Sequence, residues 1–193
     1  NNEVFALEHE EAKEVQRILR ALTATMSVYA PLLSAYLQIA GEFDFIRAKA
    51  KLAIDMNANL PELLDKAHIE LINAYHPLLY LYNKNAGKTT IPVHIKLDAQ
   101  QRILIISGPN AGGKTVTMKT IGLNQMMMQS GLLVPVSPDS QMGIFKQLFI
   151  HIGDTQNLEF ELSTYSSHLM HMKHFIEVAN GKTLFFIDEL GSG

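Results

Sequence analysis

Eight consecutive residues of this 193-residue chain form a complete G-x-x-x-x-G-K-[ST] motif. Glycines in this pattern let the backbone turn tightly and approach phosphate oxygens, which N–H groups of the loop and of the following helix then bind. The lysine of the motif reaches the β- and γ-phosphates, and its threonine hydroxyl is a ligand for Mg²⁺. We therefore expect a nucleoside triphosphate to bind with Mg²⁺ at Gly108, Pro109, Asn110, Ala111, Gly112, Gly113, Lys114 and Thr115.

The neighbouring residues place this motif where such a loop works, between a strand and a helix. The apolar run Ile103–Ile106 predicts a strand directly before the loop. Residues Lys114 to Ser130 predict the helix that follows, and Gly131 then takes the position that usually ends a helix. This context favours a phosphate-binding loop over a chance match on a glycine-rich turn.

An acidic pair follows a second apolar run near the end of the chain. The β-rich run Thr183–Ile187 predicts a strand buried in a parallel sheet, and ligands of open α/β sheets bind at the carboxyl ends of such strands. We predict that Asp188 is the Walker B carboxylate that holds Mg²⁺, and that Glu189 polarises the attacking water. Without the phosphate loop, a solvated acidic pair would be the default interpretation.

Two further elements are expected between these motifs. Residues 147–152 predict another strand, which leads into the polar segment 153–157. That segment either positions water or metal or is a plain loop. Ser163 opens a helix that is expected to run to about Ala179, before Gly181, and it is a natural N-cap for that helix.

The N-terminal part reads as helix from residue 3 to about residue 58. Pro31 predicts a kink or a new start, and Gly41 predicts a second break. Further on, Ile91–Leu97 and a turn at Asp98–Gln101 predict two antiparallel strands that feed the nucleotide site. The amphipathic face of the first helix is expected at Val15, Ile18, Leu19, Leu22 and Met26.

Composition excludes several classes of protein. The net charge is −3, from 16 basic and 19 acidic residues, so the chain is a poor candidate for a DNA-contacting surface. The absence of cysteine excludes disulfides and thiolate catalysis and suits a reducing cytoplasm, where we expect the protein to act. The sequence has no apolar run of about 18 residues, so no membrane span is expected.

Taken together, these segments resemble the ATPase domain of the MutS family, within the ABC-type branch of P-loop ATPases. The resemblance is carried by ISGPNAGGKT at 106–115, ELSTYSSH at 161–168 and FFIDELGSG at 185–193. It extends over nearly the whole chain through FDFIRAKA at 43–50 and YHPLL at 75–79. Ala111, Thr115 and the Ser-Ser-His after STY are similar to the paralogous branch that carries a C-terminal Smr nuclease domain.

The resemblance implies a fold class and a division into domains. Residues 73–193 would form an ABC-type α/β P-loop ATPase domain that stops directly after the Walker B motif, with ATP and Mg²⁺ as its ligands. Residues 1–72 would form an all-α lever or core segment, which links the ATPase to a clamp on the substrate. The alternative is a helical subdomain that packs on itself. We expect the chain to be a fragment of a longer protein.

The family also implies roles that spacing does not show. Its ATPase domains pair head to tail as a homodimer, so Ser163 would face the γ-phosphate of the partner subunit in trans, whereas the residue taken alone is an N-cap. Asn110 would contact the γ-phosphate. Ile91 would pack on the base, although MutS proper has an aromatic residue in the region where Thr90 and Ile91 stand here. His76 would either lie near the base or form a structural turn.

The implied activity is ATP hydrolysis that couples dimer closure to recognition of mismatched or branched DNA, in mismatch repair or recombination control. DNA would be bound by parts of the protein outside this chain. The alternative is the ATPase of a ribosome-binding quality-control factor, and a third possibility is a nucleotide-gated dimerisation module with negligible turnover. For this chain alone we expect weak binding and little turnover.

The role of Glu189 gives the first testable prediction. In a Glu189→Gln variant the loop still binds ATP, but the base that polarises water is gone, so ATP should stay bound without hydrolysis. Single-turnover phosphate release and retention of labelled ATP measure the two steps separately. Full turnover in the variant would remove Glu189 from this role.

Overall fold

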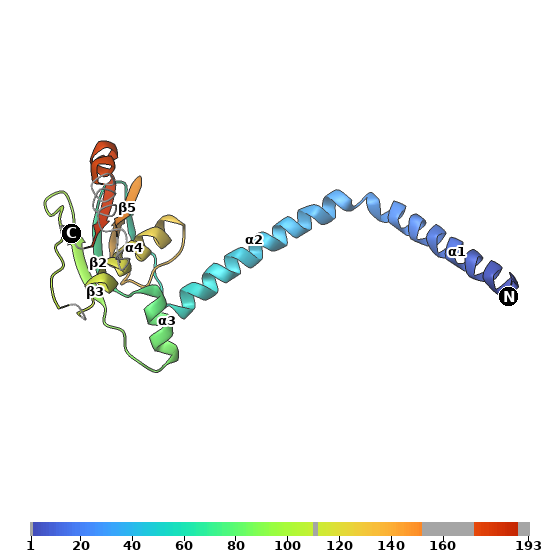
Figure 1. The fold of residues 1–193 in the computed structure, drawn as a ribbon, viewed down its shortest axis with the longest axis horizontal. Helices are drawn as coiled ribbons and strands as arrows, with labels where there is room; N and C mark the ends of the chain where they lie inside the picture. The colour runs from blue at the N-terminus through green and yellow to red at the C-terminus, as the bar shows by residue number, and fades with distance from the viewer. Residues whose placement is uncertain (1, 110–111, 152–171, 189–193) are drawn as a thin grey trace, which may run out of the picture. The chain divides into compact units, whose positions relative to one another are not determined.

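The computed structural model describes residues 2–109, 112–151 and 172–188 (Figure 1). The chain divides into two compact units, residues 1–48 and 49–193. The second unit contains the strands, the phosphate loop and the start of the Walker B motif.

The first unit consists of α1 (Asn2–Ser27) and most of α2 (Ala30–Asp55). The predicted break at Pro31 is confirmed, because the helices part at residues 28–29 and Pro31 lies in the first turn of α2, where its missing N–H is not needed. The predicted break at Gly41 was wrong. Helix α2 runs through Gly41, since one glycine costs only about 1 kcal/mol in a helix.

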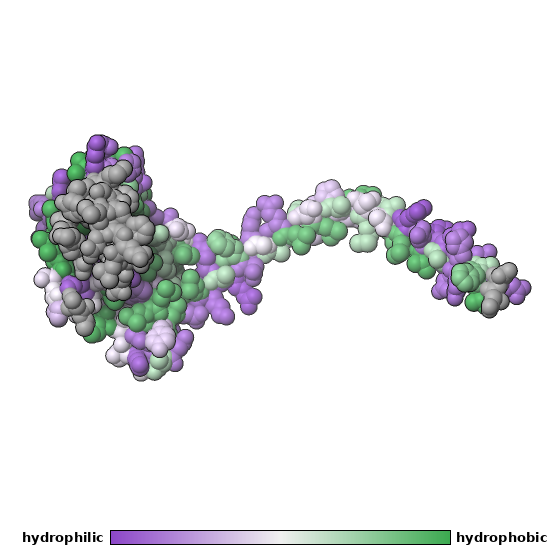
Figure 2. Space-filling model, viewed as in Figure 1, coloured by the Kyte–Doolittle hydropathy of each residue, from purple (hydrophilic) through white to green (hydrophobic). Residues whose placement is uncertain are grey.

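Apolar side chains on both helices of the first unit are exposed (Figure 2). The predicted amphipathic face of α1 is about half exposed throughout, with 45% for Ile18 and 59% for Met26. On α2, Leu37 and Phe43 are 75% and 69% exposed.

No single helix in the described ranges is long and apolar enough to cross a membrane; only α1 and α2 together, as a bent pair, meet that test of length and composition.

The described strands of the second unit form two sheets. The first is mixed, with strand order β1-β4-β2-β3, in which β1 and β4 are parallel and the other pairs are antiparallel. The second is a parallel pair, β5 and β6. The strands are β1 (Glu62–Leu64), β2 (Ile69–Ala74), β3 (Val93–Leu97), β4 (Gln141–Gly143), β5 (Gln147–His151) and β6 (Thr183–Ile187).

Strand β2 shows why the mixed sheet forms. Ile69 and Leu71 point inward and are buried, whereas Glu70 between them points outward and pairs with Lys96 on β3 at 2.8 Å. This alternation gives the sheet one apolar face. The hydrogen bond from Lys96 is the main reason why the pKa of Glu70 lies below its ordinary value.

Among the described residues, three helical segments accompany these sheets: α3 (Pro77–Asn85), α4 (Lys114–Gln129) and residues 172–178. Gly131, with φ +74°, ends α4 as predicted. The N–H groups of Gly131 and Leu132 donate to the carbonyls of Met128 and Met127, which is a Schellman motif. One apolar cluster joins α4 to strands of both sheets through Ile69, Leu71, Ile121, Met128, Met142, Leu184 and Phe186.

Several expectations about the strands need correction. The run Ile103–Ile106 does not form a strand, and the side chains of Ile103 and Ile105 are more than 80% exposed. The Asp98–Gln101 turn is present, but β3 before it pairs with β2 and not with that run.

The predicted helical segment also extends too far. Helix α2 ends at Asp55, so residues 56–72, which we expected in the helical segment, include β1 and the start of β2. Hydrogen bonding between strands that are distant in the sequence, and not the local pattern of apolar residues, therefore determined which residues form β1, β2 and β3. The architecture is still a mixture of helices and sheets, consistent with an α/β ATPase-type domain.

His76 caps α3, and this contact gives a pH-dependent prediction. Its Nδ1 accepts a hydrogen bond from the N–H of Leu79 at 3.3 Å, directly before Pro77 at the first helical position. Burial lowers the pKa of His76, with a smaller contribution from Lys119. The unfolded chain therefore takes up the proton first, and the free energy of unfolding should fall as the pH drops below about 6.5.

A His76→Asn variant keeps a side-chain cap that does not ionise. Urea unfolding at pH 7.5 and 5.5 should show a smaller loss of stability on acidification in the variant than in the wild type. Equal losses in the two proteins would rule out His76 as a source of this pH dependence.

Candidate functional site

The end of the phosphate loop has a backbone that only glycine fits. Gly113 is the residue before α4 and has φ +83°, in the left-handed region. A Cβ on Gly112 would lie 2.9 Å from the carbonyl oxygen of Pro109, which the N–H of Gly112 already approaches at 2.8 Å. The glycines of the motif therefore serve a tight turn that leads directly into the helix.

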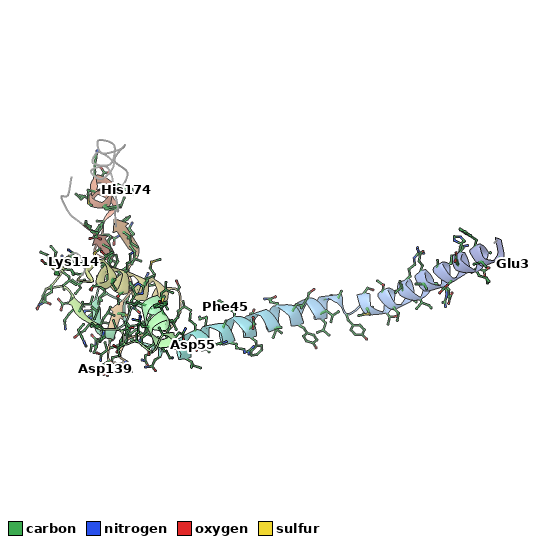
Figure 3. All side chains as sticks on the ribbon, turned by 60° about the horizontal axis from the view of Figure 1, so that its bottom comes forward. Glu3, Phe45, Asp55, Lys114, Asp139 and His174 are labelled. Atoms are coloured by element: carbon green, nitrogen blue, oxygen red, sulfur yellow. The ribbon has the colours of Figure 1, made fainter. Side chains whose placement is uncertain are left out.

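Lys114, labelled in Figure 3, is the first residue of α4. Its Nζ donates a hydrogen bond to the carbonyl oxygen of Gly108 at 2.8 Å. This places a positive charge against the loop backbone, beside the first turn of α4. That turn has N–H groups with no acceptor inside the helix itself, and the helix dipole favours an anion there.

Thr115 and Asp188 meet although they are 73 residues apart in the sequence. The hydroxyl of Thr115 donates to Oδ2 of Asp188 at 3.2 Å, so the first turn of α4 lies at the carboxyl end of β6. A hydroxyl and a carboxylate supply the oxygen ligands that Mg²⁺ prefers. The predicted pair of metal ligands is therefore brought together, and its chemistry fits the ion.

Helix α4 and strand β6 both contribute to the buried apolar cluster, through Ile121 and Phe186 among others. A Cβ on Gly122, in the middle of α4, would lie 3.6 Å from the ring of Phe186, which is ordinary van der Waals contact, so the ring faces this part of the helix with room for a methyl group between them. Phe186 is buried and stands two residues before Asp188. Its position therefore sets the distance between the helix and the end of the strand.

Two buried amides, which the sequence analysis did not identify, attach α4 to the mixed sheet. Asn124 donates to the carbonyl oxygen of Tyr75 at 3.0 Å, and Gln125 donates to that of Gly143 at 2.8 Å. Both side chains are fully buried. The signal in the sequence is a pair of amides inside an otherwise apolar helical run, and their contacts show that they orient the helix.

The other predicted site residues are placed less closely. Ile91 is 87% exposed and lies between α3 and β3. Asn110, Ala111, Ser163 and Glu189 lie outside the described residues. His76 acts as the cap of α3, as described above.

The glycine geometry gives a prediction with a matched control. A Gly112→Ala substitution forces the added Cβ against the Pro109 carbonyl, so the loop must change shape and nucleotide binding should be lost. In Gly41→Ala the added Cβ meets nothing within 4 Å, and that variant should bind as the wild type does. Binding of a fluorescent ATP analogue measures both, and circular dichroism verifies that both are folded. Unchanged affinity in Gly112→Ala would show that the loop does not need this close approach.

Comparison with known proteins adds independent support. Residues 104–193 match the family model MutS domain V. Over its whole length the chain is similar to proteins named Endonuclease MutS2: it is 40% identical to that of Ruminiclostridium cellulolyticum, 41% to that of Listeria monocytogenes serovar 1/2a and 42% to that of Pelotomaculum thermopropionicum. The chain covers 24% of each of these relatives, about a quarter of their length. By these comparisons residues 104–193 are similar to MutS domain V, and all 193 residues are similar to proteins named Endonuclease MutS2.

Proposed function

We propose that this chain carries a Mg²⁺-dependent site that binds and hydrolyses ATP. The observation that carries this proposal is the 3.2 Å contact between the Thr115 hydroxyl and the Asp188 carboxylate, at the end of a phosphate-binding loop. The match of residues 104–193 to MutS domain V supports an ATPase role. In this proposal the sheet-containing unit, residues 49–193, acts as the ATPase domain, and the helical unit, residues 1–48, acts as its lever.

In this proposal each residue of the site has a separate role in phosphoryl transfer. Lys114 and the first turn of α4 neutralise and orient the phosphates, and Asn110 contacts the γ-phosphate. Thr115 and Asp188 hold Mg²⁺, which neutralises charge that develops on the phosphate oxygens. Glu189 polarises the attacking water. Little covalent chemistry is needed, because positioning and charge supply most of the catalysis in this reaction class.

Two further contacts belong to the proposal. Ile91 packs on the face of the base, and its high exposure leaves its side chain accessible to a ligand. Ser163 completes the site of the partner subunit in a head-to-tail homodimer. ATP-driven closure of that dimer then moves the lever.

For the complete protein we propose that this movement is coupled to mismatched or branched DNA. The similar proteins are named as endonucleases, which favours a nucleic-acid substrate over a ribosome. The chain itself has a net charge of −3, so the DNA contacts are assigned to other parts of the protein. A role on ribosomes is the competing outcome of the test.

The loop lysine provides the test of the ATP site. A Lys114→Ala substitution should weaken ATP binding roughly 10- to 150-fold, because hydrogen bonds to charged groups contribute about 1.5–3 kcal/mol. Lys119→Ala, which removes an exposed lysine from the same helix, should leave the affinity unchanged. Titration calorimetry with ATP and Mg²⁺ compares the two. Equal affinities in both variants would refute the assignment of the loop.

Turnover by the complete protein tests the coupling. ATP hydrolysis should rise when a mispaired duplex or a four-way DNA junction is added, and should not rise with ribosomes. Stimulation by ribosomes alone would move the protein to translation quality control and leave only the ATP site in place.

A further inference from the structure

A cavity of about 660 Å³ lies at the end of β6 that is opposite to the proposed Mg²⁺ ligand. Its wall includes Thr183 and Leu184, the first two residues of β6, whereas Asp188 follows the last residue of that strand. A strand rises by about 3.3 Å per residue, so roughly 15 Å of β6 separates the cavity from Asp188. The cavity is therefore a separate place in the second unit, and its volume is typical of sites for small molecules.

One part of the wall is apolar. Leu97 of β3, Phe145 and Leu184 line the cavity. Phe145 and Leu184 belong to the buried apolar cluster of the second unit, and Leu97 packs against that cluster. This part of the wall offers apolar surface to the non-polar body of a ligand, which gains free energy by leaving water.

Two cationic side chains line the same cavity. Lys66 lies in the segment between β1 and β2, and its ammonium group has no ion-pair or hydrogen-bond partner in the part of the chain that the structure describes. Arg102 follows the Asp98–Gln101 turn, and its Nε donates to the carbonyl oxygen of Ala99 at 3.2 Å. This bond leaves the terminal nitrogens of the Arg102 guanidinium for an anion.

The wall has one carboxylate among its described residues, that of Asp98, and it is already engaged. Its Oδ1 accepts hydrogen bonds from the N–H groups of Gln100 and Gln101 at 2.8 and 2.9 Å. Bonds to Gln101 and Gln100 hold the pKa of Asp98 below its ordinary value. Positive charge therefore exceeds negative charge in the wall, although the chain as a whole carries a net charge of −3.

We propose that this cavity is a second ligand site, which binds a small phosphate monoester with an apolar or aromatic body. Arg102 and Lys66 bind the phosphate, and the side chains around Phe145 contact the body. A phosphate monoester carries a charge of about −1.5 to −2 at pH 7, which matches two cations, whereas a carboxylate carries one charge. A guanidinium also binds two phosphate oxygens at once, to which the ammonium adds a point charge. The assignment does not rest on the proposed ATP site.

Titration calorimetry of phenyl phosphate into the complete protein tests the proposal, because this probe combines one aromatic ring with one phosphate monoester. Inorganic phosphate lacks the ring and benzoate carries a single charge, so these two ions are the comparison ligands. Mg²⁺ and a non-hydrolysable ATP analogue are present in excess, so that the phosphate loop is occupied. Circular dichroism verifies that each variant is folded.

Phenyl phosphate should bind with a dissociation constant of about 1 mM or lower, as a ligand of this size allows, and the two comparison ligands should bind at least about fivefold more weakly. Arg102→Gln and Lys66→Gln should each weaken the binding of phenyl phosphate about tenfold, because each variant loses one hydrogen bond to a charged group. Lys88→Gln removes the same charge from an exposed residue outside the cavity and should leave the affinity unchanged.

Three results would overturn the proposal. The first is no saturable binding of phenyl phosphate up to about 10 mM. The second is equal affinity in the wild type and in both cavity variants, which would place any binding elsewhere, the phosphate loop included. The third is an equal loss of affinity in Lys88→Gln, which would reduce the effect to the attraction of an anion by the overall charge.

Chemical modification of arginine provides a measurement without substitutions. Phenyl phosphate should slow the reaction of Arg102 with phenylglyoxal at least about fivefold, since a bound phosphate covers the guanidinium. Arg20, which is exposed on α1, is the internal reference and should react at the same rate with and without the ligand. Mass spectrometry of the two peptides measures both rates, and an unprotected Arg102 at saturating phenyl phosphate would contradict the assignment.

Discussion

The contact between Thr115 and Asp188 is the constraint on which the rest of the second unit depends. A metal site made of one hydroxyl and one carboxylate works only if the first turn of α4 and the carboxyl end of β6 stay within a few ångströms of each other. The two residues are 73 positions apart, about half of the length of the unit, so local structure cannot enforce their distance. The shared apolar core does, because buried side chains of α4 and β6, among them Ile121 and Phe186, belong to one cluster.

Orientation of α4 comes at a cost in stability. Asn124 and Gln125 are buried, and in the described structure Oδ1 of Asn124 and Oε1 of Gln125 have no hydrogen-bond partner. A buried polar group without a partner costs about 1–3 kcal/mol. Their amide nitrogens, however, donate to the carbonyl oxygens of Gly143 in β4 and of Tyr75, the residue after β2. These directional bonds restrict the rotation and the axial position of the helix. Apolar side chains alone would allow the helix to slide, and Lys114 and Thr115 would then move with it.

The first unit differs from the second because many of its large apolar side chains are exposed to solvent. Helix α2 exposes large apolar side chains on several sides, including Leu37, Phe43 and Phe45. Large exposed apolar patches on a protein surface are typical of sites of interaction. This property suits the role proposed for the segment as a lever inside a larger protein.

Local chemistry in the sequence was sufficient to predict several elements. The bounds of β6 were predicted to the residue, and α4 with its end at Gly131 was predicted to within one residue, because each depends on a short apolar pattern and one turn-forming residue. The break at Pro31 follows in the same way from the missing N–H. The motif residues of the phosphate loop were also visible in the sequence, since their types and spacing are set by the chemistry of phosphate.

Only the tertiary structure decided which of these pieces meet. The pairing of β2 with β3 and β4, the buried amides of α4 and the contact between Thr115 and Asp188 all join residues that are distant in the sequence. The same holds for the run Ile103–Ile106, which has a strand-like pattern and yet no strand, because a strand exists only when a neighbouring edge supplies its hydrogen bonds. Helix α4 could be predicted because its hydrogen bonds lie within the segment. A sheet and a metal site depend on residues far away in the sequence, which the local sequence does not specify.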